Sequence, residues 1–539
     1  MTSTAAAPPA DSQQGDRAPG WTFRNHWMAH AGTHAAMRPD RTAFKFRGQV
    51  TTWLQFNDRV LRCAAALRAA GVSSGDRVAL LTLNHPWFVE SVFAANTLGA
   101  IAVPLNFRLA PPELDYILGD SDPAAVFVDA MLLPLLKAAP SSASLRTVVV
   151  FGEADLSEEG EGVHDYEALL ADHVPVDPPD VPEDATALLM YTSGTTGRPK
   201  GAMLSHRNMQ VQALTCIRAM EMFDDSDVGF LTAPFFHIAG LGSIVANIVI
   251  GIPTVIHPLG AFDPAAVLDA YEEEGATVVF NVPMQWDLIC AQPDIARRDL
   301  RLRIISWGAA PASDATLRAM ERTFPRALNV AVFGQTETSP ITCVLRGEDS
   351  LRKLGSVGQP IPTIQYRVVD ELMNDVAPGQ VGEIVYRGPT VMQGYWNKPA
   401  ETTAAFAGGW FHSGDLVRQD EEGFVWVVDR KKDMIISGGE NIYCAEVENA
   451  VANHPDVREV AVIGREDERW GQVPVAVVAL APGRTLELAD LLAFLHGTLA
   501  SYKMPKDLVV LPELPRNAGG KIVKGTLREA DRSLAPQNA

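Results

Sequence analysis

The stretch "YTSGTTGRPKGAMLSH", which runs from Tyr191 to His206, carries most of the information in this sequence. It places three glycines, several Ser and Thr hydroxyls, one proline and one lysine between an apolar run and a sequence typical of a helix. Glycines let backbone N–H groups turn inward, hydroxyls add donors, and Lys200 adds a positive charge. An ordinary turn rarely needs all of these groups at once, so the stretch predicts a phosphate-binding loop.

The spacing of this loop excludes two common nucleotide motifs. A Walker A loop carries its lysine directly after the second glycine, whereas here Lys200 follows Pro199. The glycine spacing also differs from the dinucleotide-binding fingerprint.

Composition narrows the class of protein. A chain of 539 residues has room for roughly two to four compact units. The formal net charge of −20 argues against a nucleic-acid partner but leaves room for a small anion in a local basic pocket. Five scattered cysteines without a CxxC pair are typical of reduced thiols in a cytoplasmic protein, and not of a metal site.

Neither a signal peptide nor a membrane span is expected. Residues 1–20 lack an apolar core and read as a disordered tail. The uncharged segment from Ile238 to Ile256 is interrupted by Gly251 and Pro253, which favours a buried helix, a turn and a buried strand. A peripheral membrane contact and a homodimer both remain compatible with the sequence.

Short β-rich runs alternate with helical patterns over most of the chain. The runs "DRVALLTLN", "AAVFVDA", "RTVVVFG", "ATVVFNVP" and "RIISWGAAP" each have helical sequence nearby, which predicts α/β layers with mostly parallel sheets. From about Leu354 the pattern changes to short strands with Gly and Asp at the turns. We therefore expect a large N-terminal domain over 21–431 with a β-rich subdomain at about 354–430, followed by a small, mobile α+β domain over 432–539.

The opening loop resembles the phosphate loop of the adenylate-forming superfamily, which includes acyl-CoA synthetases, adenylation domains and luciferases. Four further stretches resemble the remaining core motifs of that family, in the same order: "FGQTE" (333–337), "GWFHSGD" (409–415), "DRKKDMIISGGEN" (429–441) and "PRNAGGKIVK" (515–524). The resemblance implies activation of a carboxylate by ATP to an acyl adenylate, followed by transfer to a thiol. The implied cofactors are ATP, Mg²⁺ and coenzyme A, and bacterial fatty-acyl-CoA ligases are the most similar members.

The resemblance also assigns roles to residues. Glu337 and Thr196 would hold Mg²⁺, since a hard cation prefers oxygen ligands, and Asp415 would accept hydrogen bonds from the ribose hydroxyls. Lys521, Thr196, Glu337 and His237 form the implied catalytic set. The implied nucleotide and coenzyme contacts are Thr192, Ser193, Gly194, Thr195, Thr196, Gly197, Lys200, Gly308, Ala309, Ala310, Phe333, Gly334, Gln335, Thr336, Asp415, Val427, Arg430, Lys432, Gly438, Gly439 and Glu440.

Two of these residues imply a movement. Lys521 lies on the small domain, where its ammonium would offset charge on the α-phosphate during adenylation. Lys432 matches the family's hinge position, so rotation there would withdraw Lys521 and bring Gly438 and Gly439 to the thiol channel.

The acyl group is expected to be apolar. Amino-acid-activating relatives carry an aspartate near the stretch that here reads "PFFHIAG" (234–240), and a buried ammonium without a carboxylate would be costly. The predicted substrate wall consists of His237, Val282, Met284, Trp307, Thr338 and Ser339. A fatty acid is the favoured substrate, with an aryl acid, a small oxyanion, an amine or a carrier-protein thiol as alternative donors or acceptors. Trp307 stands where relatives tend to have a small residue, so its indole is expected to shorten or gate the tunnel.

Overall fold

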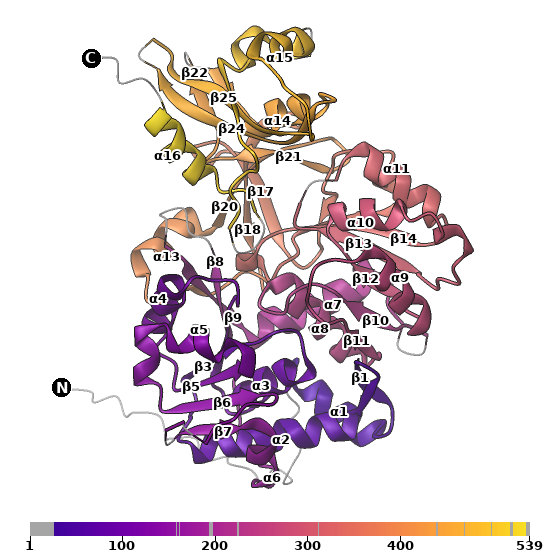
Figure 1. Cartoon of the computed structure of the whole chain (residues 1–539), viewed down its shortest axis with the longest axis vertical. Coiled ribbons are helices and arrows are strands. Elements are labelled where there is room, and N and C mark those ends of the chain that lie inside the picture. Colours follow the sequence, from indigo (N-terminus) through magenta and orange to yellow (C-terminus); the bar gives the residue numbers. More distant parts are fainter. Residues whose placement is uncertain are drawn as a thin grey trace, which may run out of the picture.

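The computed structural model describes residues 26–157, 159–160, 162–192, 198–223, 226–310, 312–437, 440–467, 469–496, 498–517 and 521–534. The predicted loop residues Ser193, Gly194, Thr195, Thr196 and Gly197, and the predicted channel residues Gly438 and Gly439, lie outside the described residues. Figure 1 shows the C-terminal part of the chain at one end of the long axis, above the larger N-terminal part.

Two large sheets form the N-terminal part, and both are mostly parallel. The first has the order β16(Gln359–Pro360), β15(Cys343–Arg346), β14(Leu328–Phe333), β13(Ile304–Gly308), β12(Val278–Phe280), β10(Gly229–Leu231), β11(Thr254–Ile256), β1(Thr42–Phe46) and β2(Gln49–Thr52). The second has the order β19(Gly394–Tyr395), β9(Lys200–Ser205), β8(Thr186–Thr192), β4(Ile101–Pro104), β3(Arg77–Leu81), β5(Ala125–Asp129), β6(Thr147–Phe151) and β7(Val163–Asp165). The predicted α/β layers are confirmed.

Helices cover these sheets because their apolar faces match the buried strands. The main N-terminal helices are α1(Ala29–Met37), α2(Trp53–Ala69), α3(Pro86–Thr97), α4(Pro111–Ser121), α7(His206–Ala219), α8(Ile238–Ile250), α9(Pro264–Glu273), α10(Pro283–Cys290) and α11(Asp314–Thr323). On the first sheet, Ile304 belongs to a core shared with α7 and α8, while its neighbour Ile305 belongs to a core shared with α9, α10 and α11. Alternate strand residues thus face opposite helix layers.

The segment 238–256 folds as the sequence predicts. Helix α8 is 13 residues long and ends at Gly251, whose left-handed φ of 84° suits a residue without a side chain. Strand β11 follows and is buried. Within the described residues, no helix is both long enough and apolar enough to cross a membrane.

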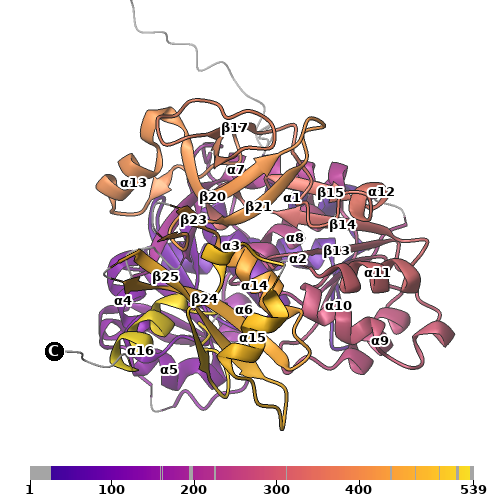
Figure 2. The same cartoon turned by 90° about the horizontal axis from the view of Figure 1, so that it is seen from above.

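The C-terminal part begins with a four-stranded antiparallel sheet in the order β17(Gln365–Val369), β18(Val381–Arg387), β20(Phe411–Gln419) and β21(Val425–Arg430). A separate mixed sheet follows, with the order β23(Glu440–Ile442), β22(Ile435–Ser437), β25(Gly471–Leu480) and β24(Val457–Asp467), while β26(Asp507–Val510) also pairs with β25. The helices α14(Cys444–Ala452), α15(Leu488–Leu495) and α16(Lys524–Leu534) belong to this small α+β unit, which Figure 2 shows from above.

A side-chain hydrogen bond joins the antiparallel sheet to the small α+β unit across the predicted hinge. The carboxylate of Asp429, at the end of β21, accepts from the backbone N–H of Cys444 at the start of α14. The same carboxylate accepts from the N–H of Arg430, 2.7 Å away. Lys432 lies in the turn that follows β21, between Asp429 and Cys444 along the chain.

Candidate active site

A cleft of about 2330 Å³ is lined by residues of both the large and the small unit. Its walls include the carboxyl ends of several parallel strands, where Leu231, Phe280, Gly308 and Phe333 are found. Ligands of α/β proteins bind at this edge of a sheet because the loops that follow the strands converge there.

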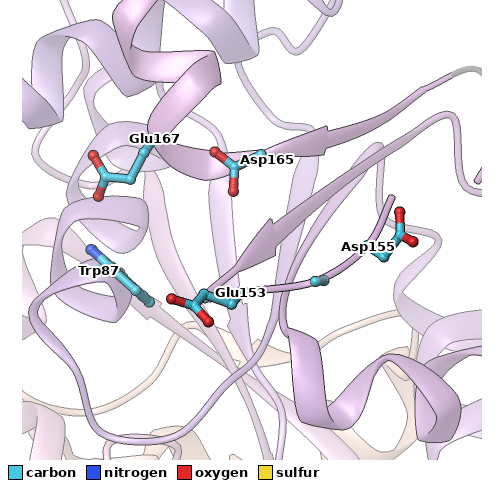
Figure 3. Close-up of a pocket in the computed structure, with 7 residues that line it drawn as sticks. Trp87, Glu153, Asp155, Asp165 and Glu167 are labelled. Carbon is cyan, nitrogen blue, oxygen red and sulfur yellow. The ribbon is translucent and has the colours of Figure 1, made fainter. Parts of the chain in front are cut away.

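A second cavity, of about 650 Å³, lies at the far edge of the second sheet (Figure 3). It is lined by Trp87, by Glu153 and Asp155 from the loop after β6, by Asp165 at the end of β7, and by Glu167 of α6(Tyr166–Ala171). None of its described lining residues is basic, so the cavity would repel an anionic nucleotide. The large cleft, whose lining includes Arg430, Lys432 and Lys521, is the better fit to an anionic nucleotide.

Most of the described residues predicted for the site line this cleft. They are Thr192, His237, Val282, Trp307, Gly308, Ala309, Ala310, Phe333, Gly334, Gln335, Thr336, Glu337, Val427, Arg430, Lys432 and Lys521. Gly308 and Gly334 allow the walls to come close: an added Cβ would lie 2.4 Å from the carbonyl oxygen of Val332 at Gly308, and 1.9 Å from that of Pro340 at Gly334. Asp415 is buried beside the cleft, and Lys200 and Glu440 lie outside its lining.

The carboxylate of Glu337 is held by two hydroxyl groups. Glu337 lies in the short 3₁₀ turn Thr336–Thr338, and its Oε1 accepts from Thr192 Oγ1 and from the Tyr395 hydroxyl, each 3.1 Å away. Both donors use the same oxygen, which leaves Oε2 for another ligand. The ammonium of Lys200 lies 5.3 Å from the centre of the Tyr395 ring, a cation–π distance.

This donor set fits Mg²⁺ bound together with nucleotide phosphates. Within the described residues, no group of three or more His, Cys, Asp or Glu side chains could hold a metal by itself. Mg²⁺ is usually bound through one or two carboxylates plus substrate phosphates, and Glu337 would supply such a carboxylate.

Asp415 is buried beside Arg430. The Nε atom of Arg430 lies 2.7 Å from Asp415 Oδ1, yet its N–H is not directed at that oxygen, so the contact supplies charge without a hydrogen bond. Oδ1 is therefore a buried acceptor without a donor among the described residues. A ribose hydroxyl would provide the missing donor, so this site fits the sugar of a nucleotide.

The charge state of Asp415 predicts how ATP use depends on pH. Burial raises the pKa of Asp415 from 3.8 to about 6, although Arg430 and Lys521 oppose the shift. Below pH 6 the carboxylate protonates and becomes a weaker acceptor, so kcat/KM for ATP should fall by up to about tenfold per pH unit. The measurement is the pH profile of kcat/KM for ATP, in which Asp415→Asn should have low activity and no inflection near pH 6.

Stability should change in the opposite direction. Between pH 3.8 and 6 the native Asp415 binds more protons than the unfolded chain, because its pKa is raised on folding. The contribution of this group to the free energy of unfolding therefore falls as pH rises through that window. A wild-type ATP profile that matched Asp415→Asn would contradict the assignment.

Lys521 and His237 meet in the cleft although they come from different units. Desolvation in the cleft and the charge of Arg430 lower the pKa of Lys521, while Asp415 and Glu337 raise it. Desolvation, followed by the charges of Lys521 and Arg108, lowers the pKa of His237 to about 4, so its imidazole is neutral at pH 7. Both side chains keep exposed surface because the cleft is open to water. The structure thus brings the Lys521 side chain into the cleft, within electrostatic range of Asp415, Glu337 and His237.

Part of the lining of the cleft follows α8 from His237. Ala239, Gly242, Ser243, Ala246 and Asn247 line it, at the spacing of one helix face. Cys216, Met220, Met222, Leu231 and Val278 line the same stretch from α7, the segment after it, and the sheet. We call this stretch the α8 pocket.

The structure does not bring every predicted substrate residue to this pocket. Met284 is 68% exposed because α10 buries Trp286 and Ile289 instead, and Gln285 lines the cleft in its place. Thr338 and Ser339 are fully buried and do not line the cleft. The hydroxyl of Thr338 donates to the carbonyl oxygen of Gln335 at 2.9 Å, within the 3₁₀ turn.

Trp307 lies mainly in the core, contrary to the expected gate. Its indole is 7% exposed and belongs to the core that contains Trp286 and Leu317, on the sheet face opposite α8. Its Nε1–H donates to Asn329 Oδ1 at 2.9 Å. Only an edge of the residue reaches the cleft, so its main role in this structure is packing.

Trp307→Gly should therefore destabilise the large domain. Removing a buried indole costs about 3–5 kcal/mol, and the Asn329 amide also loses its donor. Urea unfolding should show a lower midpoint, while the ratio of kcat/KM values across acids of different length stays unchanged. Trp470→Gly is the control, since Trp470 is 44% exposed. If the dependence of kcat/KM on acid length changed while stability did not, Trp307 would act as a gate of the acyl tunnel after all.

Comparisons with known proteins identify the family of the chain. The chain matches the AMP-binding enzyme family over residues 32–396 and the AMP-binding enzyme C-terminal domain over residues 446–521. It is 41% identical over 501 residues to an indoleacetate–CoA ligase of Aromatoleum aromaticum, covering 92% of this chain and 96% of the relative. It is also 41% identical over 499 residues to a feruloyl-CoA synthase of an Amycolatopsis species, with the same coverage. The solved anthranilate CoA ligase in complex with anthranoyl-AMP superposes with a TM-score of 0.85 at 28% identity, covering 95% of this chain and 98% of that one.

The chain belongs to the AMP-binding enzyme family. It is an ATP-dependent acid–CoA ligase, and its cofactors are ATP, Mg²⁺ and coenzyme A. Sequence reasoning missed Tyr395, which contacts both Glu337 and Lys200, because a tyrosine in "QGYWNKP" looks like an ordinary strand residue.

Proposed function

We propose that this enzyme converts an aromatic carboxylic acid to its CoA thioester through an acyl adenylate, releasing AMP and pyrophosphate. The observation that carries the proposal is the α8 pocket. It begins at a neutral His237, its walls are mostly apolar, and none of the described residues along it is acidic. Such a pocket suits an uncharged ring attached to a carboxylate and disfavours an amino acid.

Two kinds of evidence favour a ring over a long alkyl chain. The relatives that are 41% identical act on indoleacetate and ferulate, which are both aromatic acids. Helix α8 rises about 15 Å over the ten residues between His237 and Asn247, which limits the depth available along it. A fatty acid, the favoured substrate from the sequence alone, becomes the second candidate.

Different residues of the cleft have different roles in the first half-reaction. His237 at the mouth of the pocket can donate a hydrogen bond to the substrate carboxylate and fix its direction. Thr192 and Tyr395 hold the carboxylate of Glu337, and Lys521 brings a cation to the side on which phosphoryl oxygens gain charge. Mg²⁺, when bound at Glu337, would neutralise charge on the ATP phosphates.

The second half-reaction would follow a rotation of the small domain about Lys432. This residue lies at the predicted boundary between the two domains, 431–432. This rotation would withdraw Lys521 from the cleft and admit the thiol. We also propose a cytoplasmic location, which the five free cysteines support.

A panel of acids tests the proposal. Purified enzyme is given ATP, Mg²⁺ and CoA with indole-3-acetate, 4-hydroxycinnamate, benzoate, octanoate or palmitate, and both AMP and acyl-CoA are measured. We expect the highest kcat/KM for an aromatic acid and equal amounts of AMP and thioester. Higher kcat/KM for the alkyl acids would overturn the aromatic assignment, and adenylate without thioester would overturn CoA as the acceptor.

A further inference from the structure

The α8 pocket contains one polar side chain that the protein itself does not use. Asn247 is 3% exposed and lines the cleft. Among the described residues, its side-chain amide has no hydrogen-bond partner, although its backbone carbonyl accepts from Gly251 and Ile252 at the end of α8. The amide is not among the fully buried, unpartnered polar groups of the described residues, so it faces the cleft, where a polar group on an otherwise apolar helix face can meet a ligand.

The position of this amide is fixed by its surroundings. A Cβ built on Gly229 would lie 2.2 Å from Asn247 Nδ2, so the amide occupies the space that any larger residue at 229 would fill. Gly229 begins β10 and pairs with Thr254 and Val278 of the neighbouring strands. Asn247 is thus held against the sheet.

The amide lies at the opposite end of the pocket from His237. The two residues are ten positions apart on one helix, which corresponds to a rise of about 15 Å. A carboxylate at His237 would leave the far end of an aromatic acid near Asn247.

Other polar groups of the pocket are already satisfied by the protein. The hydroxyl of Ser243 donates to the carbonyl oxygen of Ala239 at 2.8 Å. Thr232 donates to the carbonyl oxygen of Phe280 at 3.1 Å. Asn247 therefore differs from its neighbours in having both a donor and an acceptor free for a ligand.

We propose that Asn247 determines specificity by hydrogen-bonding a polar group on the ring of the acyl substrate, distal to the carboxylate. The favoured substrate class is an aromatic acid with a ring hydroxyl, whose O–H can donate to Oδ1 and whose oxygen can accept from Nδ2. A ring N–H would use Oδ1 alone. This inference rests on the proposed aromatic substrate and adds the position and chemistry of its ring substituent.

Matched substrates test the inference. The ratio of kcat/KM for 4-hydroxycinnamate to that for cinnamate measures recognition of the hydroxyl, and the ratio for indole-3-acetate to naphthalene-1-acetate measures recognition of the ring N–H. We expect wild type to favour 4-hydroxycinnamate by about tenfold or more, because cinnamate leaves the Asn247 amide buried and unpaired. In Asn247→Leu, which keeps the branched shape and removes both polar atoms, the ratio should fall to about one or below.

Two controls separate this role from folding. Asn449→Leu makes the same substitution on α14, where Asn449 lines the cleft outside the α8 pocket, and should leave the ratio unchanged. If Asn247→Leu fails to fold, as judged by thermal unfolding, the smaller Asn247→Ala is measured instead and should lose the same preference.

The outcomes distinguish this inference from the proposed function. Activity with both cinnamates and an unchanged ratio in Asn247→Leu would overturn the role of Asn247 and leave the aromatic ligase intact. Activity with alkyl acids alone would overturn the proposed function itself. A wild-type preference for cinnamate over 4-hydroxycinnamate would also contradict the inference.

Discussion

Replacing Lys521 by alanine should lower the rate of adenylate formation by about 1000-fold. Lys521 reaches the cleft from the small domain, where its charge acts on Asp415, Glu337 and His237. A cation in this place matters most when negative charge grows on the phosphoryl oxygens, so the loss should appear in kcat more than in KM. The measurement is acid-dependent pyrophosphate release.

The second half-reaction supplies the internal control for this variant. Given a preformed acyl adenylate and CoA, Lys521→Ala should make thioester at nearly the wild-type rate, since the proposed rotation withdraws this lysine. Lys506→Ala removes an exposed lysine of the same domain and should affect neither step. Equal losses in both half-reactions would contradict the two-conformation interpretation.

Replacing Glu337 by glutamine should reduce metal-dependent activity by about 100-fold or more. Glutamine keeps the shape of the side chain but removes the charge that faces Mg²⁺, and Thr192 and Tyr395 would still hold its amide oxygen. The direct measurement is the affinity of Mn²⁺ for the enzyme bound to a non-hydrolysable ATP analogue, followed by electron paramagnetic resonance.

Tyr395→Phe should have a smaller effect on the metal site than Glu337→Gln. It removes one of the two donors to Glu337 and keeps the ring beneath Lys200, so Mn²⁺ affinity should weaken less than in Glu337→Gln. Unchanged Mn²⁺ affinity in Glu337→Gln would remove this residue from the metal site.

The layered α/β fold could be predicted because its strands have strong local patterns. Runs such as "RVALL" and "AVFVD" are apolar throughout, as expected for parallel strands buried on both faces, and they form β3 and β5. Because such a strand is apolar at every position, its sequence does not show which face of the sheet each side chain is on. The sequence therefore places Trp307 in the acyl pocket, whereas in the structure its neighbour Ser306 faces α8 and Trp307 faces the opposite layer.

Helix phase limited the prediction in a similar way. Successive residues of a helix point about 100° apart, so a motif places a helix near a site without fixing which residue faces it. In α10 the burial of Trp286 and Ile289 turns Met284 to solvent. Asn247 has no sequence signal at all, because its meaning depends on packing against Gly229 and on the absence of a partner within the described chain.

The hydrogen bond between Asp429 and Cys444 holds the two domains in the orientation seen in this structure. The bond links residues on either side of Lys432, so a large rotation of the small domain about that residue would separate its two partners. A hydrogen bond weakens steeply as its geometry departs from the ideal, and a buried carboxylate that has lost its donor is costly. Intermediate orientations of the small domain are therefore disfavoured. We expect the domain to switch between distinct orientations and not to move continuously between them.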